Sequence, residues 1–225
     1  MYHSHSLTVE QLLGRRLNDV EAKYAPKELY VSGPLEVPLP GPRVSVVGTR
    51  MPSESGLRAA AEIVEKLVRG KALIVSGLAK GIDTAAHRRA LELGGFTVAV
   101  IGTPLDRFYP PENRDLQERL MREQLVVSQF PQGHHTARRD FIMRNRTMAL
   151  ISDATVIVEA GERSGAESQG WEAIRLGRPL YLSDFLFEKG VTWAKKMLDY
   201  GAVRLEDPEK ILDELPSPLR EPLPI

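Results

Sequence analysis

Short, uninterrupted apolar runs alternate along this chain with longer stretches in which apolar residues recur every three or four positions. The runs predict strands that are buried on both faces of a sheet. They cover residues 44–48, 72–76, 96–102, 125–130, 154–160 and 178–182. The longer stretches predict helices that pack one face against that sheet. They cover residues 55–68, 83–93, 112–123, 141–150, 166–176, 192–199 and 208–215.

This alternation predicts an α/β fold, because short loops between strands and helices favour right-handed crossovers and a parallel sheet. We therefore expect a doubly wound, mostly parallel sheet with an extended Rossmann-like fold over residues 43–215. Residues 1–42 are predicted to form an N-terminal helix and a proline-rich extended lead-in. The helix is placed within residues 1–28, where Thr8-Val9-Glu10-Gln11 has the spacing of a capping box. Residues 216–225 are predicted to be a proline-rich tail.

Charge and cysteine content narrow the function classes. The 225 residues include 30 Lys and Arg and 30 Asp and Glu, so any attraction for nucleic acid must come from local basic clusters. The absence of Cys excludes disulfides, thiol catalysis and Cys-based metal sites. No apolar run is long enough to span a membrane, and the first residues, MYHSHSL, lack the pattern of a signal peptide. We expect a cytoplasmic protein that has no membrane partner.

The loops after the strands carry the candidate chemistry, because ligands of doubly wound sheets bind beyond the carboxyl ends of the strands. In Gly48-Thr49-Arg50, the glycine lets a ligand come close to the backbone, the threonine offers a hydroxyl, and the arginine offers a planar guanidinium suited to phosphate. Ser76-Gly77 and then Lys80-Gly81 lead into a helix, where free amides and a lysine favour an anion. This loop lacks the GK[ST] ending of a P-loop. The alternative interpretation is that both loops are plain turns, in which Ser53 and Asp83 cap the helices that follow.

Arginine and aromatic residues fill the next two loops. Phe108 and Tyr109 lie among arginines after the third strand, and they either stack on bases or pack beneath their own loop. Arg144-Asn145-Arg146 belongs to an arginine-rich helix start, where cations cost stability unless acidic neighbours or a bound phosphate backbone compensate. His134 and His135 do not predict a metal site, because neighbouring loop side chains do not by themselves converge on one ion.

Ser164-Gly165, after the fifth strand, forms another turn that favours an anion at the start of a helix. Glu159 and Glu167 nearby are interpreted as solvated carboxylates rather than acid–base catalysts. These loops predict no catalytic residue and no metal site. Since the carboxyl ends of parallel strands share one edge of a sheet, the turns together predict a phosphate-binding edge. The phosphate belongs either to a nucleotide or to a nucleic acid.

These motifs, in this order, resemble those of the DNA-processing protein A family (DprA, also called Smf) over roughly residues 28–215. The matching stretches are Gly48-Thr49-Arg50, residues 76–83, Gly102 with residues 109–113, Phe141 with Arg144-Asn145-Arg146, Val158-Glu159-Ala160 with Arg163-Ser164-Gly165, Gly190 with Thr192, and Tyr200-Gly201-Ala202. Several motifs in a fixed order are far more specific than one glycine-rich loop.

The resemblance implies a protein that binds single-stranded DNA, forms a homodimer and passes the strand to a RecA-type recombinase, as in DNA-mediated transformation. It implies no cofactor and no catalytic step. Carried over by position, Arg50 and Lys80 are the leading phosphate contacts, followed by Arg144 and Arg146. The residues implied to form the rest of the pocket are Gly48, Thr49, Ser76, Gly77, Gly81, Asn145, Ser164 and Gly165.

The chain departs from the family pattern in a few places. The helix start that usually reads like SGSLITA is Ser164-Gly165-Ala166-Glu167-Ser168-Gln169-Gly170 here. Ser183-Asp184 replaces the usual Pro-Gly, and Gln129 stands where an acid is common. The helical and winged-helix modules that often accompany the family domain are not recognisable in the sequence. These departures bear more on recombinase handover than on DNA binding.

The alternative function is a nucleotide-binding sensor, or an enzyme similar to the phosphoribohydrolases that cleave nucleoside monophosphates within the same fold superfamily. Those enzymes have a PGGxGTxxE motif after a strand. Residues 160–167 of this chain read AGERSGAE, without the Pro-Gly-Gly start. This difference disfavours the hydrolase and leaves simple nucleotide binding open. A scaffold with a vestigial pocket is a third interpretation.

Overall fold

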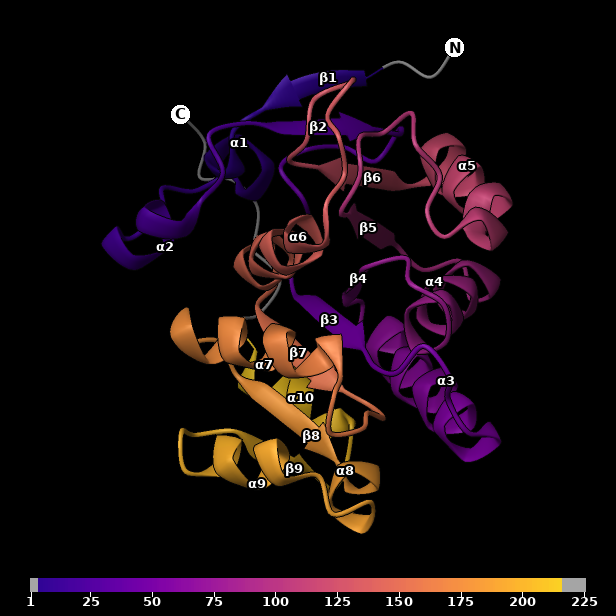
Figure 1. Cartoon of the computed structure of the whole chain (residues 1–225), viewed down its shortest axis with the longest axis vertical. Helices are drawn as coiled ribbons and strands as arrows, with labels where there is room; N and C mark the ends of the chain where they lie inside the picture. The colour runs from indigo at the N-terminus through magenta and orange to yellow at the C-terminus, as the bar shows by residue number, and fades with distance from the viewer. Residues whose placement is uncertain (1–3, 216–225) are drawn as a thin grey trace.

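Valine, isoleucine and leucine build the central strands, and every residue of the six strands from β3 to β8 is buried. The computed structural model describes residues 4–215, and its strands form one nine-stranded sheet in the order β1-β2-β6-β5-β4-β3-β7-β8-β9 (Figure 1). The parallel strands are β3 (Arg43–Val47), β4 (Leu73–Ser76), β5 (Thr97–Ile101), β6 (Leu125–Ser128), β7 (Ala154–Ile157), β8 (Leu180–Ser183) and β9 (Val203–Leu205). The predicted doubly wound, mostly parallel α/β fold is confirmed. The predicted tail, residues 216–225, lies outside the described residues.

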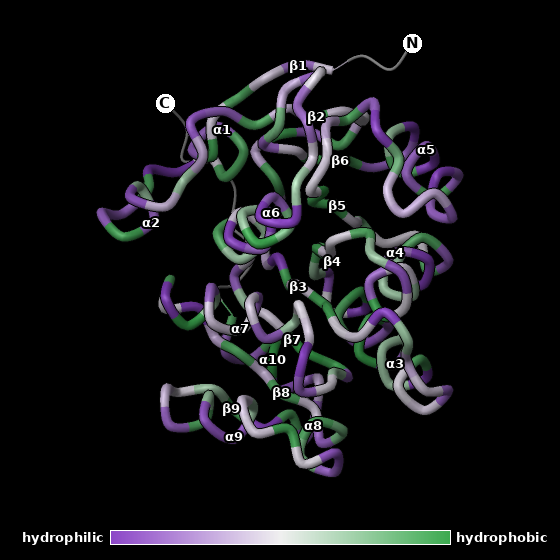
Figure 2. The backbone as a smooth tube through the Cα atoms, in the orientation of Figure 1, coloured by the Kyte–Doolittle hydropathy of each residue, from purple (hydrophilic) through white to green (hydrophobic). Residues whose placement is uncertain are grey.

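Helices cover both faces of the sheet because successive strand residues face opposite sides. Leu73 and Val75 of β4 pack in one hydrophobic core, and Ile74 between them packs in another. Figure 2 shows hydrophobic stretches along the central strands and mixed stretches along the covering helices. The first face carries α6 (Arg138–Ile151), α7 (Gly165–Arg175) and α9 (Thr192–Leu198). The second face carries α3 (Glu54–Arg69), α4 (Ile82–Glu92), α5 (Arg114–Glu123) and α10 (Glu209–Glu214). No helix among residues 4–215 is long and apolar enough to cross a bilayer.

The N-terminal segment differs from the predicted helix and extended lead-in. It forms two antiparallel strands, β1 (Ser4–Leu7) and β2 (Leu29–Ser32), that extend the sheet beyond β6. Between them lie two short helices, α1 (Val9–Leu13) and α2 (Asp19–Tyr24). The capping box at Thr8 is confirmed, because its side chain accepts from the Gln11 amide. The prediction missed β2 because four residues are too short for a clear alternation, although Leu29 and Val31 are fully buried.

Three further short elements were not predicted. They are a 3₁₀ turn, η1 (Pro111–Asn113), the helix α8 (Asp184–Glu188) and the strand β9 (Val203–Leu205). Each has between three and five residues, which is below the length at which periodicity identifies an element.

The order of the strands places a topological switch point between β3 and β7. From β3 the chain builds outward through β4, β5 and β6, and it then returns to the other side of β3 with β7, β8 and β9. The chain continues from β3 to α3 on one face of the sheet and from β7 to α7 on the other, which leaves a crevice at the carboxyl edge. This is the edge where the sequence places its glycine-rich and basic turns.

The buried carboxylate of Glu21 supports a prediction about stability. Glu21 is 1% exposed and forms ion pairs with Arg15, at 2.6 Å, and with Arg178. The hydrogen bond from Arg15 is the main reason why the pKa of Glu21 falls from 4.5 to about 2. We expect Glu21→Gln to lower the free energy of unfolding by about 3 kcal/mol at neutral pH, because two guanidinium groups lose their carboxylate.

The effect of Glu21→Gln depends on pH in a definite direction. A carboxylate whose pKa is lowered by folding stabilises the protein above its unfolded pKa, and that contribution disappears as the pH falls through the folded pKa. The difference between variant and parent should therefore shrink between pH 4.5 and about 2. Urea unfolding across this range measures it, with Glu123→Gln, at an exposed ion pair with Arg119, as the control. A difference that stays constant with pH would contradict the assignment.

Candidate functional site

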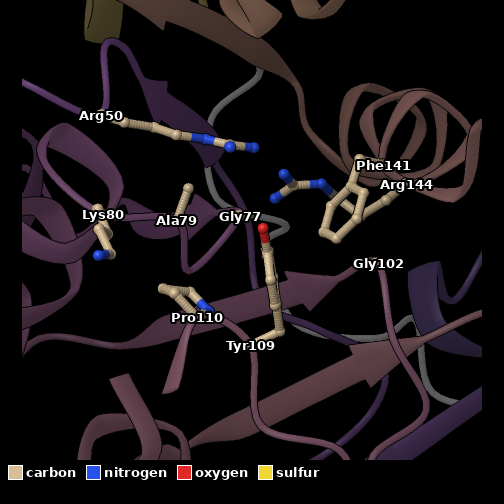
Figure 3. A pocket seen from close by; sticks show the side chains of 9 residues that line it. All are labelled: Arg50, Gly77, Ala79, Lys80, Gly102, Tyr109, Pro110, Phe141 and Arg144. Carbon is tan, nitrogen blue, oxygen red and sulfur yellow. The ribbon is translucent and has the colours of Figure 1, made fainter. Parts of the chain in front are cut away.

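A small cavity of about 60 Å³, here called the inner pocket, opens at the carboxyl ends of β3, β4 and β5. Three cationic side chains and two aromatic rings surround it (Figure 3). The residues that line it are Arg50, Gly77, Ala79, Lys80, Gly102, Tyr109, Pro110, Phe141 and Arg144. The structure thus brings together residues that are up to 94 positions apart in the chain (Arg50 and Arg144), as the common sheet edge predicted.

Arg144 is the buried cation of the inner pocket. It projects from α6 and is only 6% exposed. Its Nη1 atom donates to the carbonyl oxygen of Val100 at 3.2 Å, whereas its buried Nε atom has no hydrogen-bond partner among the described residues. A methyl group at position 77 would lie 1.4 Å from Nη1, so Gly77 is the residue that lets the guanidinium lie against the end of β4. Burial lowers the pKa of Arg144, yet an arginine stays charged.

Asp83 is the acid nearest to Arg144, and it compensates the buried charge only in part. Its Oδ2 atom lies 4.0 Å from Nη1 of Arg144 and accepts from the amide of Gly77 at 3.1 Å. Burial raises the pKa of Asp83, although the charge of Arg144 and nearby backbone amides act in the opposite direction. The sequence allows Asp83 to cap α4, but in the structure no side chain caps that helix, and Asp83 instead accepts from the amides of Gly77 and Ala79 in the turn that follows β4.

A buried histidine lies behind this pair. His87 is fully buried on α4, and its Nδ1 atom is 2.7 Å from the hydroxyl of Thr97. Burial lowers the pKa of His87 to about 3, so the imidazole is neutral near pH 7. It therefore adds no charge to the cationic cluster in front of it.

Arg50 is the exposed partner of Arg144. Its guanidinium points toward that of Arg144 across the inner pocket (Figure 3). Arg50 forms no ion pair with the residues that the structure describes, and its charge further lowers the pKa of Arg144. Two facing guanidinium groups repel each other, and an anion placed between them removes the repulsion and accepts from both.

Glycines hold the turns around Arg50 and Lys80 close together. A methyl group at Gly48 would lie 2.7 Å from the carbonyl oxygen of Glu159, and one at Gly81 would lie 2.3 Å from that of Thr49. Gly81 also has a φ of +79°, which other residues rarely adopt. The amide of Thr49 in turn donates to the carbonyl of Glu159 at 2.6 Å. These contacts tie the loops after β3, β4 and β7 into one rigid rim.

Lys80 lines the inner pocket, but its ammonium group is already paired. It forms an ion pair with Glu112, whose side chain is 61% exposed against 52% for Lys80. Glu112 follows the Tyr109-Pro110-Pro111 turn, and the hydrogen bond from Lys80 lowers its pKa. An exposed pair of this kind contributes little stability, so an incoming anion can separate it at low cost.

The two aromatic residues predicted for base stacking have different surroundings. The ring of Tyr109 is 44% exposed, lines the inner pocket and lies 5.2 Å from the ring of Phe141. Phe108 instead lies under the guanidinium of Arg114, 4.8 Å away, and lines a different pocket near β2. The sequence indicates Phe141 only as part of a motif, and its place one turn before Arg144 on α6 is the signal that both side chains share a face.

A second pocket, here called the switch-point pocket, adjoins the inner pocket and has a volume of about 750 Å³. It lies between the loop after β3 and the starts of α6 and α7, and shares Arg50 and Arg144 with the inner pocket. Of the predicted residues, it is lined by Gly48, Thr49, Arg50, Arg144, Asn145, Ser164 and Gly165. Asn145 donates to the carbonyl of Gly165 at 3.1 Å and so joins α6 to the start of α7.

Besides Phe108 and the turn residue Gly81, two predicted residues line neither pocket, namely Ser76 and Arg146. Ser76 is fully buried beneath the pockets, where its hydroxyl donates to the carbonyl of Val46 at 2.7 Å. Arg146 points away toward α7, where its Nε donates to Glu172 at 3.1 Å and its guanidinium lies over the ring of Tyr24. Arg146 therefore stabilises the contact between α2, α6 and α7 and does not line either pocket.

Two acidic residues near the helix starts bear on the sequence interpretation, of which Glu159 corrects it and Asp140 agrees with it. Glu159 is fully buried rather than solvated, and it is held by Lys189 and by the amide of Ser53 at 3.0 Å. These contacts lower the pKa of Glu159 although burial acts against them. Asp140 accepts from the amide of Ala137 at 2.8 Å and from His134 at 2.7 Å. It supplies part of the compensation predicted for the arginines at the start of α6.

The fold and the site together define a Rossmann-type protein with a small cationic pocket at the carboxyl edge of its sheet. The family model for DNA recombination-mediator protein A matches residues 9–216. The chain belongs to this family, as its ordered motifs predicted.

Relatives with known structures have the same architecture. The chain is 42% identical over 160 residues to the DNA processing protein DprA of Streptococcus pneumoniae, which covers 70% of this chain and 55% of that protein. The crystal structure of that pneumococcal protein superposes with a TM-score of 0.79 at 32% identity, covering 94% of this chain and 74% of the other. DprA of Helicobacter pylori, which binds single-stranded DNA, superposes with a TM-score of 0.78 at 24% identity, covering 94% and 95% of the chains. Across the first three curated relatives, the chain spans 31% to 65% of their length.

The close contact between Gly77 and Arg144 leads to a stability prediction. We expect Gly77→Ala to lower the free energy of unfolding by about 1–3 kcal/mol, because the new methyl group displaces a buried guanidinium. Gly165→Ala is the matched control, since a methyl group there meets no atom within 4 Å and lies at a helix start. Urea unfolding compares the two variants with the parent. Equal stability of the two variants would contradict the packing described here.

Proposed function

We propose that the protein binds single-stranded DNA and holds one backbone phosphate between Arg50 and Arg144. The facing guanidinium groups carry this proposal, because one is buried with an unpartnered Nε atom and the other has no acidic partner among residues 4–215. A phosphate diester accepts several hydrogen bonds, and its negative charge supplies the counterion that both guanidinium groups lack. Family membership and the DNA-binding Helicobacter relative support the same ligand.

The aromatic residues favour a single strand over a duplex. Tyr109 and Phe141 offer ring surface beside the inner pocket, and only an unpaired base can turn toward such a surface. The net charge of the chain is zero, so attraction for DNA has to come from local basic clusters such as this edge and not from a general positive field. Binding through phosphates and ring stacking predicts strong salt dependence and little sequence preference.

We further propose that the protein acts by binding, without a catalytic step. The buried carboxylates near the pockets are engaged, Glu159 with Lys189 and Ser53, and Asp83 with backbone amides and Arg144. We also propose a cytoplasmic homodimer that passes its strand to a RecA-type recombinase, which family membership supports. Light scattering measures the molar mass in solution, which we expect to be that of a dimer. Loading of a RecA-type recombinase onto DNA coated with single-strand-binding protein measures the handover.

Arg50→Ala tests the phosphate contact. We expect it to weaken binding of fluorescent oligo-dT by about tenfold and to reduce the log–log salt slope by about 0.7, the value for one phosphate contact on a single strand. Fluorescence anisotropy at several salt concentrations measures both quantities. Arg69→Ala is the control, because Arg69 is 75% exposed at the far end of α3, where it pairs with Glu65 and lines neither pocket. Unchanged binding by Arg50→Ala would refute the proposed contact.

The ion pair between Lys80 and Glu112 allows an opposite prediction. We expect Glu112→Gln to tighten oligo-dT binding by about twofold to fivefold, because Lys80 no longer has to leave a carboxylate in order to reach the phosphate. Lys80→Ala should weaken binding less than Arg50→Ala does, because part of the lysine charge is already neutralised. The same anisotropy titration measures these effects, with Glu206→Gln, which removes the partner of Lys210, as the control. Weaker binding by Glu112→Gln would show that Lys80 does not contact the DNA.

A further inference from the structure

The switch-point pocket has features that a single backbone phosphate does not use. Its volume of about 750 Å³ lies within the range of small-molecule sites and far exceeds the inner pocket's 60 Å³. It reaches inward past Asn145 and Met148 of α6 and past Gln169 of α7 as far as Val47 of β3. It thus has an outer end at the helix starts and an inner end at the sheet.

The outer end suits an anion. Ser164 caps α7, a helix of 11 residues whose first turn lines the pocket. Arg138 and Arg163 line the same end, both are exposed, and neither forms an ion pair within the part of the chain that the structure describes. The positive end of the helix dipole and two available guanidinium groups favour a phosphate here.

The inner end contains an unpartnered polar group. Gln169 is 1% exposed, lines the pocket, and has a buried Oε1 atom without a hydrogen-bond partner among the described residues. Its Nε2 atom makes only a long contact of 3.5 Å with the hydroxyl of Thr155. Since that hydroxyl can donate or accept, the amide can turn either its oxygen or its nitrogen toward a ligand. An unsatisfied buried amide costs stability, and a ligand that pairs with it recovers that loss.

The mouth of the pocket adds apolar surface. Met51 is 88% exposed and Ile142 is 53% exposed, and both line the pocket on opposite sides, from the loop after β3 and from α6. The pocket therefore combines an anion site, an apolar mouth and a buried amide. A nucleotide has the matching parts, namely a phosphate, flat ring faces, and a sugar and base with donors and acceptors.

We propose that the switch-point pocket binds a nucleotide, with its phosphate at the start of α7 beside Arg138 and Arg163 and its sugar or base at Gln169. The nucleotide is either a free nucleoside monophosphate or the unit of a bound strand next to the phosphate held by Arg50 and Arg144. The second source rests on the proposed function, whereas the first does not. Because the two pockets share Arg50 and Arg144, a free nucleotide competes with a DNA strand.

Two variants separate this site from the inner pocket. Gln169→Leu keeps the size of the side chain and removes its polar end. Gly165→Leu adds a side chain at an exposed position of the pocket lining, and its Cβ atom meets nothing within 4 Å, so we expect it to obstruct the outer end of the pocket. Thermal unfolding verifies that both variants fold, and Arg69→Ala is again the control.

Isothermal titration with AMP and with dTMP, and anisotropy with oligo-dT, distinguish the two sources. If free nucleotides occupy the pocket, AMP or dTMP binds the parent and displaces oligo-dT, and both variants weaken that binding by about tenfold. If only a strand unit occupies it, the mononucleotides do not bind and both variants weaken oligo-dT binding instead. If both variants bind every ligand as the parent does, the proposed site is refuted. Failure of the parent to bind oligo-dT, with AMP binding lost in the variants, refutes the proposed function and leaves the nucleotide site standing.

Discussion

The burial of one positive charge organises this edge of the molecule. Arg144 lies inside the protein with an acid 4.0 Å away and one unpartnered nitrogen, which is incomplete compensation for a buried ion. The surrounding features follow from that burial: a glycine at 77 that leaves space, an acid at 83 that faces the guanidinium, and a neutral histidine at 87 behind it. The remaining charge is presented toward the pocket. The proposed phosphate contact rests on this incomplete compensation, because a bound anion would supply the missing negative charge.

Much of this architecture could be predicted, because the central strands are continuously apolar and because apolar residues recur every three or four positions along the helices. The common edge of the loops after β3, β4, β5 and β7 follows from parallel strand order, so the convergence of Arg50, Lys80 and Tyr109 was predictable before any contact was known. The short elements were not predictable from the sequence. The strands β2 and β9 contain only four and three residues, and they depend on pairing with distant strands. Their stability comes from tertiary contacts that no local pattern reports.

The errors within the site have one physical cause. A sequence shows that an arginine or glutamate follows a strand, but not which opposite charge reaches it first. Arg144 and Arg146 are two positions apart on α6, so a rotation of about 200° about the helix axis separates their side chains. Arg144 therefore faces the inner pocket, whereas Arg146 pairs with Glu172. Glu159 is likewise engaged by Lys189, 30 positions away. Which opposite charge a side chain meets depends both on the face of its helix and on the order of the strands in the sheet.

The switch point also constrains when the site can exist during synthesis. Arg50 and Lys80 leave the ribosome long before β7, yet the rim that positions them needs the carbonyl of Glu159, and the anion end of the larger pocket needs α7. β7 pairs with β3 across more than 100 intervening residues, so this contact cannot form until most of the chain has been made. A nascent chain that stops before β7 leaves one side of β3 as an unpaired edge and has no assembled pocket. The two pockets are therefore complete only after β7 and the start of α7 have been added beside β3, well before the last strands and helices are made.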